Sequence, residues 1–285
     1  MKRRALVLSA ALALAAFAAP ASRPAAAYRK PEDVAAALRG YAASHPRLTK
    51  LEAMGRGSGG TEIWVLRLAA QPPGAPDPDA RPGVFVAANV EGVHLIGTEA
   101  ALGLAERLLS GYGKDKGLTA LLDRTTVYIA PLLNPDTARK AFASPLSEAW
   151  ANARPVDADL DAQEDEDGPD DLNKDGLITQ MRVKDPEGRY IPDPKDPRLM
   201  RLADARKGER GIYALYTEGA DDDGDGAFNE DAAGGVEVNR NFPHDFEYGN
   251  QAAGLYPTSE AETTALLKFL TARAHIALVL NFGTE

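Results

Sequence analysis

Two stretches of this sequence place side-chain oxygens at the spacing used by calcium-binding loops. Each has oxygen donors at positions 1, 3 and 5, a glycine at position 6 for the sharp turn, and a backbone carbonyl at position 7. The predicted ligands are Asp171, Asn173, Asp175 and the carbonyl of Leu177 in the first loop, and Asp221, Asp223, Asp225, the carbonyl of Ala227 and Asn229 in the second. Because calcium takes roughly six to eight hard oxygen ligands, closely spaced carboxylates on a turning backbone suit it.

The twelfth position of both loops departs from this pattern. A bidentate glutamate is expected there, but Arg182 and Ala232 occupy it. The acids that could complete the two ligand shells are Asp165 and Asp167 for the first loop, and Glu230 or Asp231 for the second. The competing interpretation is an acidic surface loop without an ion. If calcium does bind, it orders the segment, because so many carboxylates would otherwise repel one another.

A carboxylate and an imidazole stand three residues apart in Glu91-Gly-Val-His94. Both side chains can donate to zinc. Residues 84–90 before them are apolar and predict a strand, and a helix is expected to open at Thr98. Open α/β sheets place their binding sites at such a strand-to-helix turn. The turn is therefore a candidate zinc site, and the competing interpretation is an ion pair that lines a cleft without metal.

The remaining elements predict how these residues are positioned. Hydrophobic periodicity predicts helices at residues 31–43, 98–109 and 259–272, and strands at residues 48–54, 62–68, 84–90, 127–132 and 276–282. Strands separated by long helices indicate an α/β protein with a mainly parallel mixed sheet and helices on both faces. Ser259 and Glu262 have the spacing of a capping box for the last helix. Residues 155–233 form an acidic, loop-rich insertion.

The first 27 residues are typical of a secretory signal. Basic residues 2–4 precede an apolar run at residues 5–19, and alanines at residues 25–27 provide a cleavage site. An uncleaved anchor is the alternative, but the run is shorter than the ~20 residues that span a bilayer. We therefore expect an exported protein, secreted or periplasmic, with residues 28–285 as one domain and no membrane attachment after cleavage.

Charge and cysteine content limit the partners. The formal net charge of −10 becomes −14 when Lys2, Arg3, Arg4 and Arg23 leave with the signal. Such a chain repels nucleic acid and anionic membranes, so neither is expected as a partner. The sequence has no cysteine, so disulfides are excluded, and bound zinc would rely on nitrogen and oxygen ligands.

Four segments, in this order, resemble the zinc carboxypeptidase family, the carboxypeptidase A superfamily. They are Glu91-Gly-Val-His94, which reverses the family's His-x-x-Glu, then Asn134-Pro135-Asp136, then Asn239-Arg240-Asn241-Phe242-Pro243, and finally the helix from residue 259 with the strand at residues 276–282. The Asn-Arg-Asn-Phe-Pro stretch is the most specific of them. The resemblance spans about residues 31–285.

The resemblance implies zinc-dependent hydrolysis of a peptide or amide bond next to a free carboxylate. Zinc would be held by Glu91 and His94 and by a third ligand, but the matching stretch at residues 281–283 has no histidine. Arg240 would hold the terminal carboxylate bidentately, with Asn239 hydrogen-bonded to the same group. The competing interpretation pairs Arg240 with an acid of the neighbouring insertion.

The resemblance also implies two groups that the sequence does not supply. A second family arginine follows a tryptophan, and the nearest match is Trp150-Ala151, so Arg139 or Arg154 would have to replace it. The family's general-base glutamate lies beyond Glu285, which indicates a C-terminally incomplete chain.

We therefore expect an exported carboxypeptidase-like protein with a calcium-ordered insertion. Its partner would be a peptide or peptide-like substrate with a free carboxylate. Because the third zinc ligand and the base are not found, we expect no turnover by the chain as written. The alternative is a non-catalytic, calcium-ordered module that binds peptide carboxylates and has lost the metal.

Overall fold

A computed structural model describes residues 28–283 except 148, 158–161, 163, 166, 223, 225, 227 and 230–234. The predicted secretory signal lies outside the described residues. Among the residues that are described, no helix is both long and apolar enough to cross a membrane.

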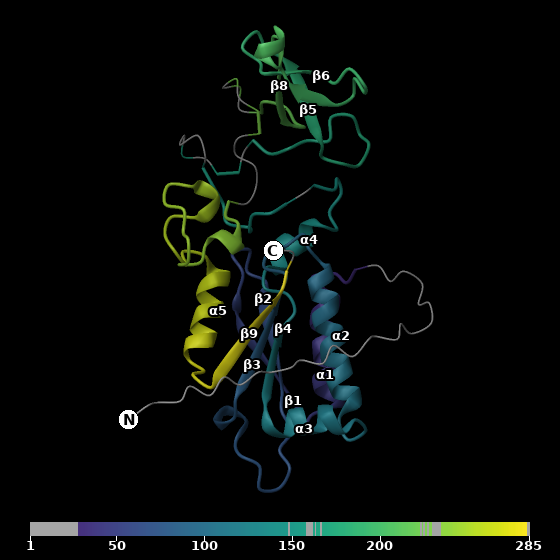
Figure 1. Ribbon diagram of the computed structural model, residues 1–285, viewed down its shortest axis with the longest axis vertical. Coiled ribbons are helices and arrows are strands. Elements are labelled where there is room, and N and C mark those ends of the chain that lie inside the picture. Colours follow the sequence, from purple (N-terminus) through teal and green to yellow (C-terminus); the bar gives the residue numbers. More distant parts are fainter. Residues whose placement is uncertain are drawn as a thin grey trace.

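Five strands form the central sheet in the order β1-β2-β4-β3-β9 (Figure 1). They are β1 (Thr49–Arg56), β2 (Glu62–Leu68), β3 (Gly83–Ala88), β4 (Thr126–Ala130) and β9 (Ile276–Phe282). The β1–β2 and β2–β4 pairings are antiparallel, whereas β3–β4 and β3–β9 are parallel. The predicted α/β class with a mixed sheet is confirmed, and its two kinds of pairing are equal in number.

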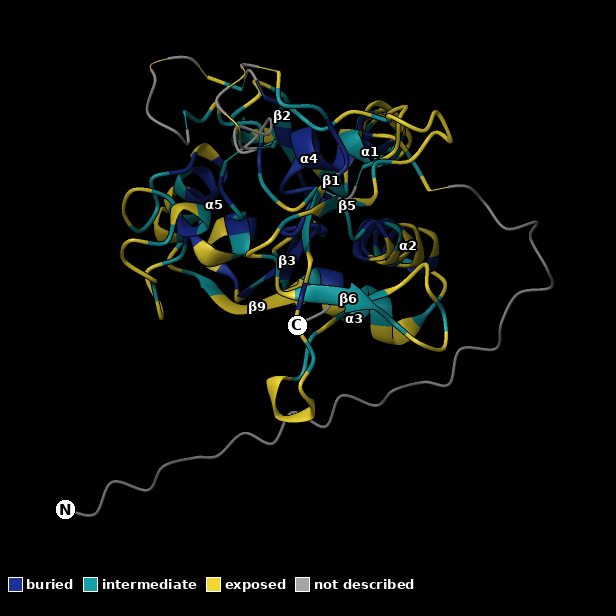
Figure 2. Ribbon diagram, turned by 90° about the horizontal axis from the view of Figure 1, so that it is seen from above, coloured by how far each residue is buried: buried dark blue, intermediate teal, exposed yellow. Residues whose placement is uncertain are grey.

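Helices cover both faces of this sheet (Figures 1 and 2). On one side are α1 (Pro31–Ser44), α2 (Ile96–Gly111) and α3 (Lys116–Arg124), and on the other side is α5 (Ala261–Thr271). Short segments complete the chain: α4 (Pro135–Lys140), and the 3₁₀ turns η1 (Pro78–Ala80), η2 (Ala205–Lys207), η3 (Val238–Arg240) and η4 (Gln251–Ala253). Helices on both faces explain why the central strands read as continuous apolar runs.

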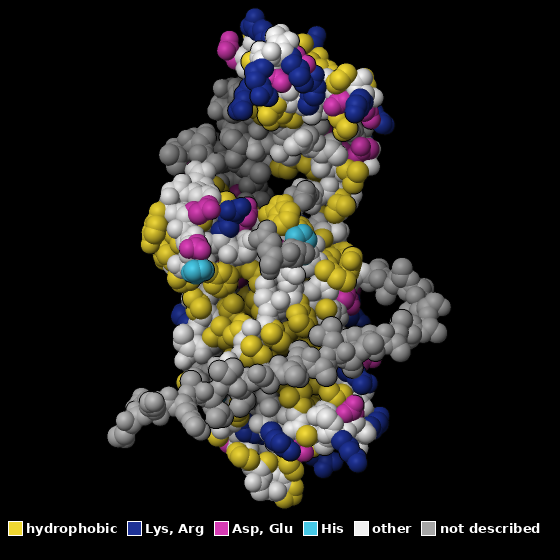
Figure 3. Space-filling view, in the orientation of Figure 1, with side chains coloured by type: hydrophobic (Ala, Val, Ile, Leu, Met, Phe, Trp, Pro, Cys, Tyr) yellow, Lys and Arg dark blue, Asp and Glu magenta, His cyan; other side chains and the backbone are white. Residues whose placement is uncertain are grey.

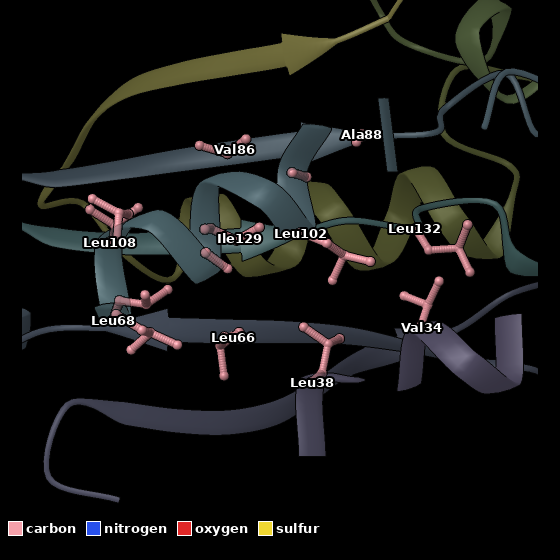
Figure 4. Close-up of a cluster of buried hydrophobic side chains, with 14 of the residues drawn as sticks. Val34, Leu38, Leu66, Leu68, Val86, Ala88, Leu102, Leu108, Ile129 and Leu132 are labelled. Atoms are coloured by element: carbon pink, nitrogen blue, oxygen red, sulfur yellow. The ribbon is translucent and has the colours of Figure 1, made fainter. Parts of the chain in front are cut away.

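Successive side chains of β3 face opposite cores. Val86 and Ala88 belong to the cluster formed with α1 and α2 (Figure 4), while Phe85 and Ala87 belong to the cluster beneath α5. Phe85 and Phe269 of α5 pack with ring centroids 5.5 Å apart. This alternation is the two-residue period of a strand, and burial on both faces fixes its register.

The carboxyl ends of β3, β4 and β9 meet at one edge of the sheet. After β3 and β4 the chains stay paired, since the Leu133 amide donates to the Ala88 carbonyl at 3.0 Å and the Asn134 amide to the Asn89 carbonyl at 3.1 Å. A Cβ on Gly97 would lie 2.1 Å from the carbonyl oxygen of Phe282. Only glycine therefore allows the start of α2 to approach the end of β9 this closely.

The insertion contains a second sheet that the sequence analysis missed. It is antiparallel, in the order β5-β8-β6-β7, and lies at the end of the molecule beyond α4 (Figure 1). Its strands are β5 (Gln180–Lys184), β6 (Tyr190–Pro192), β7 (Met200–Leu202) and β8 (Tyr213–Thr217). Two strands of three residues, set among Pro, Gly and charged residues, carry too little periodicity to be found.

The predicted capping box of the last helix is wrong. α5 begins after Glu260 and has no side-chain cap. The Glu262 carboxylate instead accepts hydrogen bonds from the Ser58 amide at 2.8 Å and the Ser58 hydroxyl at 2.7 Å, and the Ser259 hydroxyl donates to Glu260. Buried tertiary partners have replaced the local cap.

Candidate functional site

The turn after β3 holds Glu91 and His94 at the carboxyl edge of the sheet. Asn89 has φ 59°, and its side-chain amide donates to the Gly92 carbonyl at 2.5 Å and to the His94 carbonyl at 3.4 Å. Gly92 has φ 62°, and a Cβ there would lie 2.3 Å from Cγ2 of Thr137 on α4. The turn is therefore tied internally by Asn89 and pressed against α4.

Glu91 and His94 contact each other directly. Nδ1 of His94 lies within hydrogen-bonding distance of Oε2 of Glu91, and Glu91 is only 8% exposed. Trp150 packs against the His94 ring edge-to-face, with centroids 4.9 Å apart and planes at 88°. The predicted candidate ligands thus form an acid–imidazole pair under an aromatic ring.

The described residues do not complete a three-ligand zinc site. No group of three or more His, Cys, Asp or Glu side chains with metal-holding geometry occurs among them. His275 contacts the Tyr128 hydroxyl at 3.0 Å, near the start of β9, and His244 has a side chain 93% exposed beside Asp245. Glu91 and His94 supply two donors, whereas catalytic zinc sites use three from protein.

Asn239 and Arg240 lie on η3 and line a cleft together with Trp150, Glu237, His244, Asp245 and Glu247. Since Trp150 also packs on His94, one aromatic side chain connects the cleft with the Glu91–His94 pair. Figure 3 shows a face of the molecule on which hydrophobic side chains gather between the positions that α5 and α2 have in Figure 1.

Arg240 is held by two acids. Its Nε donates to Oε2 of Glu237 at 2.6 Å, and its NH1 lies 3.5 Å from Oε2 of Glu247. Both acids follow residues 155–233 in the sequence, so they do not belong to the insertion, where the sequence analysis expected a competing partner. The Arg240 side chain is 44% exposed, so it borders the open cleft while its charge is already balanced by the two acids.

The two arginines considered as replacements for the second family arginine are engaged elsewhere. Arg139 pairs with Glu32 at 2.9 Å, and Arg154 donates to the buried Glu260 at 3.1 Å. Each guanidinium already has a carboxylate partner outside the cleft.

Two asparagines of the family-like motifs, Asn134 and Asn241, have structural roles. Asn134 accepts from the Thr137 amide at 3.3 Å, which caps α4, and donates to the Val90 carbonyl at 3.5 Å, next to Glu91. Asn241, fully buried, accepts from the Glu260 amide at 3.1 Å and the Thr263 hydroxyl at 2.7 Å. The motif residue beside Arg240 therefore fixes η3 to the start of α5.

The first predicted calcium loop has a tight, self-bonded conformation. The Asp171 carboxylate accepts from the amides of Asp175 and Gly176 at 3.1 and 2.8 Å, and Asn173 accepts from the Asp175 amide at 2.8 Å. The Leu177 amide donates to Asp175 at 2.9 Å. These four predicted residues lie on one turn, with Gly176 at φ 87°.

Glu218 secures this loop from the end of β8. Its buried carboxylate accepts from the Asn173 amide at 3.1 Å, the Thr179 amide at 3.2 Å and the Thr179 hydroxyl at 2.8 Å. The Thr179 hydroxyl and these backbone amides lower the pKa of Glu218 below its ordinary value of 4.5, because they stabilise the ionised form.

The second loop is described only in part, because Asp223, Asp225 and Ala227 lie outside the described residues. Asp221 accepts from the amides of Gly224 and Gly226 at 2.7 and 3.1 Å. Asp167, considered as a ligand for the first loop, packs against the second: it is 1% exposed and accepts from the amides of Asp222 at 3.2 Å and Asn229 at 2.7 Å.

Comparison with known proteins finds similarity to one family over slightly less than half of the chain. Residues 34–166 match the family described as zinc carboxypeptidase. Carboxypeptidase D of Anas platyrhynchos is 34% identical over 137 residues, which are 47% of this chain and 10% of the relative. Carboxypeptidase M of Mus musculus is 32% identical over 112 residues, 38% of this chain and 24% of the relative. The chain thus spans a tenth to a quarter of these relatives.

Solved structures show the same fold. Thrombin-activatable fibrinolysis inhibitor superposes with a TM-score of 0.53 at 15% identity, over 89% of this chain and 46% of that one. Carboxypeptidase A from Helicoverpa armigera gives a TM-score of 0.50 at 15% identity, over 89% and 45%. At this identity the likeness concerns the fold alone.

Proposed function

The chain belongs to the zinc carboxypeptidase family, and from this premise we propose that it is an exported protein that binds the free carboxylate of a peptide without hydrolysing it. The observation that carries the proposal is the cleft in which Trp150 links Arg240 to the Glu91–His94 pair. The parent activity would be zinc-dependent hydrolysis of a peptide or amide bond beside that carboxylate. The proposal keeps the recognition step and omits the chemical step.

Arg240 is the group that would bind the carboxylate. A guanidinium stays charged at any working pH and offers its donors in a fixed fork that matches a carboxylate. A ligand carboxylate would replace the longer contact, to Glu247 at 3.5 Å, while the 2.6 Å hydrogen bond to Glu237 orients the fork. Asn239 on the same 3₁₀ turn would donate to the second ligand oxygen.

The same acids make binding weak. Glu237 and Glu247 place two negative charges beside one guanidinium, so an anionic ligand enters a locally negative environment. Arg240 is also partly exposed, which screens its attraction for a carboxylate. We expect dissociation constants in the high micromolar to millimolar range, corresponding to about −4 to −6 kcal/mol.

Hydrolysis is not expected because the described residues supply too few zinc ligands at the site. Metal-activated water needs a metal in an open site and a base for its proton. The described residues give zinc two donors, and those two contact each other. Zinc held weakly by Glu91 and His94 remains compatible with this arrangement, but no reaction step follows from it.

The insertion suggests a role for calcium, as a second part of the proposal. Asp171, Asn173, Asp175 and the Leu177 carbonyl would hold one ion, and Asp221, Asp223, Asp225, the Ala227 carbonyl and Asn229 a second. Support comes from the first loop, whose donors already lie on one turn anchored by Glu218. A non-catalytic, calcium-ordered binding module is thus the candidate that agrees with finding no third zinc ligand among the described residues.

Peptide titration tests the binding proposal. A peptide with a free C-terminus should bind about 3- to 10-fold more tightly than its amide, since one partly exposed charge-assisted contact is at stake. Arg240→Leu should remove that preference. Arg198→Leu is the matched control, because Arg198 is an exposed arginine paired with Asp196 away from the cleft. Equal affinities of the free acid and the amide for the unmodified protein would refute the proposal.

Metal analysis of the purified protein separates the two readings of the site. Calcium without zinc supports the binding module. Zinc in near-stoichiometric amount supports a working metal centre and favours the parent activity over the binding module.

A further inference from the structure

Asn152 joins two distant segments of the chain next to the cleft. Its backbone amide donates to the Val236 carbonyl at 2.7 Å, and the Val236 backbone amide donates to the side-chain Oδ1 of Asn152 at 3.3 Å. The adjoining residues, Ala151 and Glu237, form an antiparallel bridge. The chain therefore enters and leaves the insertion through one paired stem.

Both walls of the cleft continue directly from this stem. Trp150 precedes it on one segment, and η3 with Arg240 follows it on the other. The bridge residue Glu237 is also the acid that orients Arg240. A shift in the pairing of Asn152 with Val236 would therefore change the position of Arg240 relative to Trp150.

The side-chain amide of Asn152 fixes the stem to the core. Its Nδ2 donates to Oε2 of Glu260 at 2.8 Å and Oε2 of Glu262 at 3.2 Å, and the three side chains belong to residues 0%, 2% and 1% exposed. Ionised carboxylates are acceptors only, so the group between them must supply two donors. Arg154, on the same segment, gives Glu260 its cationic partner at 3.1 Å.

These contacts exceed what a simple hairpin stem requires. Backbone pairing alone would join the two segments, but it would leave them free to move together over the sheet edge. The carboxamide links the pair to α5, whose start is also bonded to Asn241 beside Arg240. The positions of Trp150 and Arg240 are thus both fixed relative to α5.

We propose that Asn152 is a positioning residue of the carboxylate site, acting by holding Trp150 and Arg240 at a fixed separation across the cleft. The proposal rests on the carboxylate-binding function proposed above. It assigns Asn152 no contact with the ligand.

The test first replaces the Asn152 side-chain donor by an acceptor, and then places a donor on the opposite residue, Glu260. Asn152→Asp keeps the shape but puts an acceptor against two buried carboxylates, so the stem should separate from α5. Glu260→Gln in the same chain returns a donor at the shorter contact and keeps the number of carboxylates unchanged. Asn152→Ala removes the donors without adding charge. The single variant Glu260→Gln completes the double-mutant cycle.

Two readouts separate this proposal from the binding proposal. The chain has two tryptophans, so a Trp64→Phe background leaves Trp150 as the only indole, and its emission and acrylamide quenching report the His94 contact without any ligand. Peptide titration then measures the preference for a free carboxylate over an amide. Thermal melting of each variant measures the fold separately.

We expect the variants to rank in the same order by Trp150 quenching and by peptide titration. Asn152→Asp and Asn152→Ala should make Trp150 more accessible to quencher and remove most of the acid-over-amide preference, a loss of about 3- to 10-fold in affinity for the free acid. In the double variant, Trp150 quenching and the acid-over-amide preference should both return towards their values in Glu260→Gln. Its melting temperature should still differ from that of the unmodified protein. Unchanged Trp150 emission in Asn152→Asp, or a double variant no better than Asn152→Asp, overturns the proposal. If only the peptide arm shows no preference in any variant, the binding function fails while the emission arm still decides the role of Asn152.

Discussion

Substitution of Gly92 by alanine should destabilise the protein far more than the same substitution at Gly60. Both glycines have positive φ, 62° and 86°, so both variants force alanine into the left-handed region at about 1–2 kcal/mol. The reduced flexibility of the unfolded chain returns about 0.4–1 kcal/mol in each. The two positions therefore share their backbone cost.

Space around the new methyl group distinguishes them. At Gly60 nothing lies within 4 Å of an added Cβ, whereas at Gly92 the methyl would lie 2.3 Å from Cγ2 and 2.4 Å from Cβ of Thr137. Contact with Cβ cannot be relieved by rotating the threonine, so α4 or the turn must move. Overpacking of this kind costs about 1–3 kcal/mol, and that is the difference we expect between the two variants.

Urea denaturation followed by circular dichroism measures this difference. For a domain of this size, about 1–3 kcal/mol corresponds to a melting temperature about 2–12 °C lower for Gly92→Ala than for Gly60→Ala. Because Gly92 lies between Glu91 and His94, the variant should also disturb the His94–Trp150 contact. Equal stabilities of the two variants would show that the turn does not press on α4 and would refute the reasoning.

Three further predictions concern the insertion and the turn that holds Glu91 and His94. Chelation of calcium should lower the melting temperature and expose residues 155–233 to protease, with binding at about 0.1–1 mM; if neither changes, the loops are ordinary acidic surface. Glu218→Gln should destabilise the insertion at neutral pH, and the deficit should shrink on acidification. The pKa of Glu218 is lowered on folding, so its contribution is complete above the unfolded pKa near 4.5 and is lost as the pH falls through the folded value; a deficit constant from pH 7 to pH 3 would contradict this. The chain should release no C-terminal residue from peptides with added zinc, and zinc-dependent release that Glu91→Ala or His94→Ala abolishes would overturn this prediction.

The central sheet could be predicted because its strands are apolar runs in the sequence, although only β2, β3 and β4 are largely buried and most of β9 is exposed. The predicted ranges 62–68 and 276–282 agree with β2 and β9. The helix predicted from Thr98 begins two residues earlier, at Ile96, where the tight approach to Phe282 sets the start of α2. The insertion sheet could not be predicted, because its short strands leave most side chains partly exposed and carry little hydrophobic pattern.

The site divides in the same way. Glu91, His94, Asn239 and Arg240 could be named as candidates because each lies in a short motif with a recognisable chemistry. Asn152 and Glu260 are 108 positions apart and belong to no motif. An Asn between small residues and a Glu at a helix start are typical of exposed surface, and only the fold shows that both are buried. Supporting contacts made across the fold leave no trace in local sequence.

The reversed Glu-x-x-His pair is consistent with the proposed role of the cleft, which is to bind a carboxylate without hydrolysing the peptide. A carboxylate that is 8% exposed needs a hydrogen-bonding partner, and an unmet need of this kind costs about 1–3 kcal/mol. His94 meets the need of Glu91, and Trp150 packs over the imidazole, so the turn is stable without a metal. Arg240 is balanced in the same way by Glu237 and Glu247. Both groups that a substrate or metal would use are already satisfied within the protein, so either ligand must displace an internal partner to bind, and weak, reversible recognition follows from that competition.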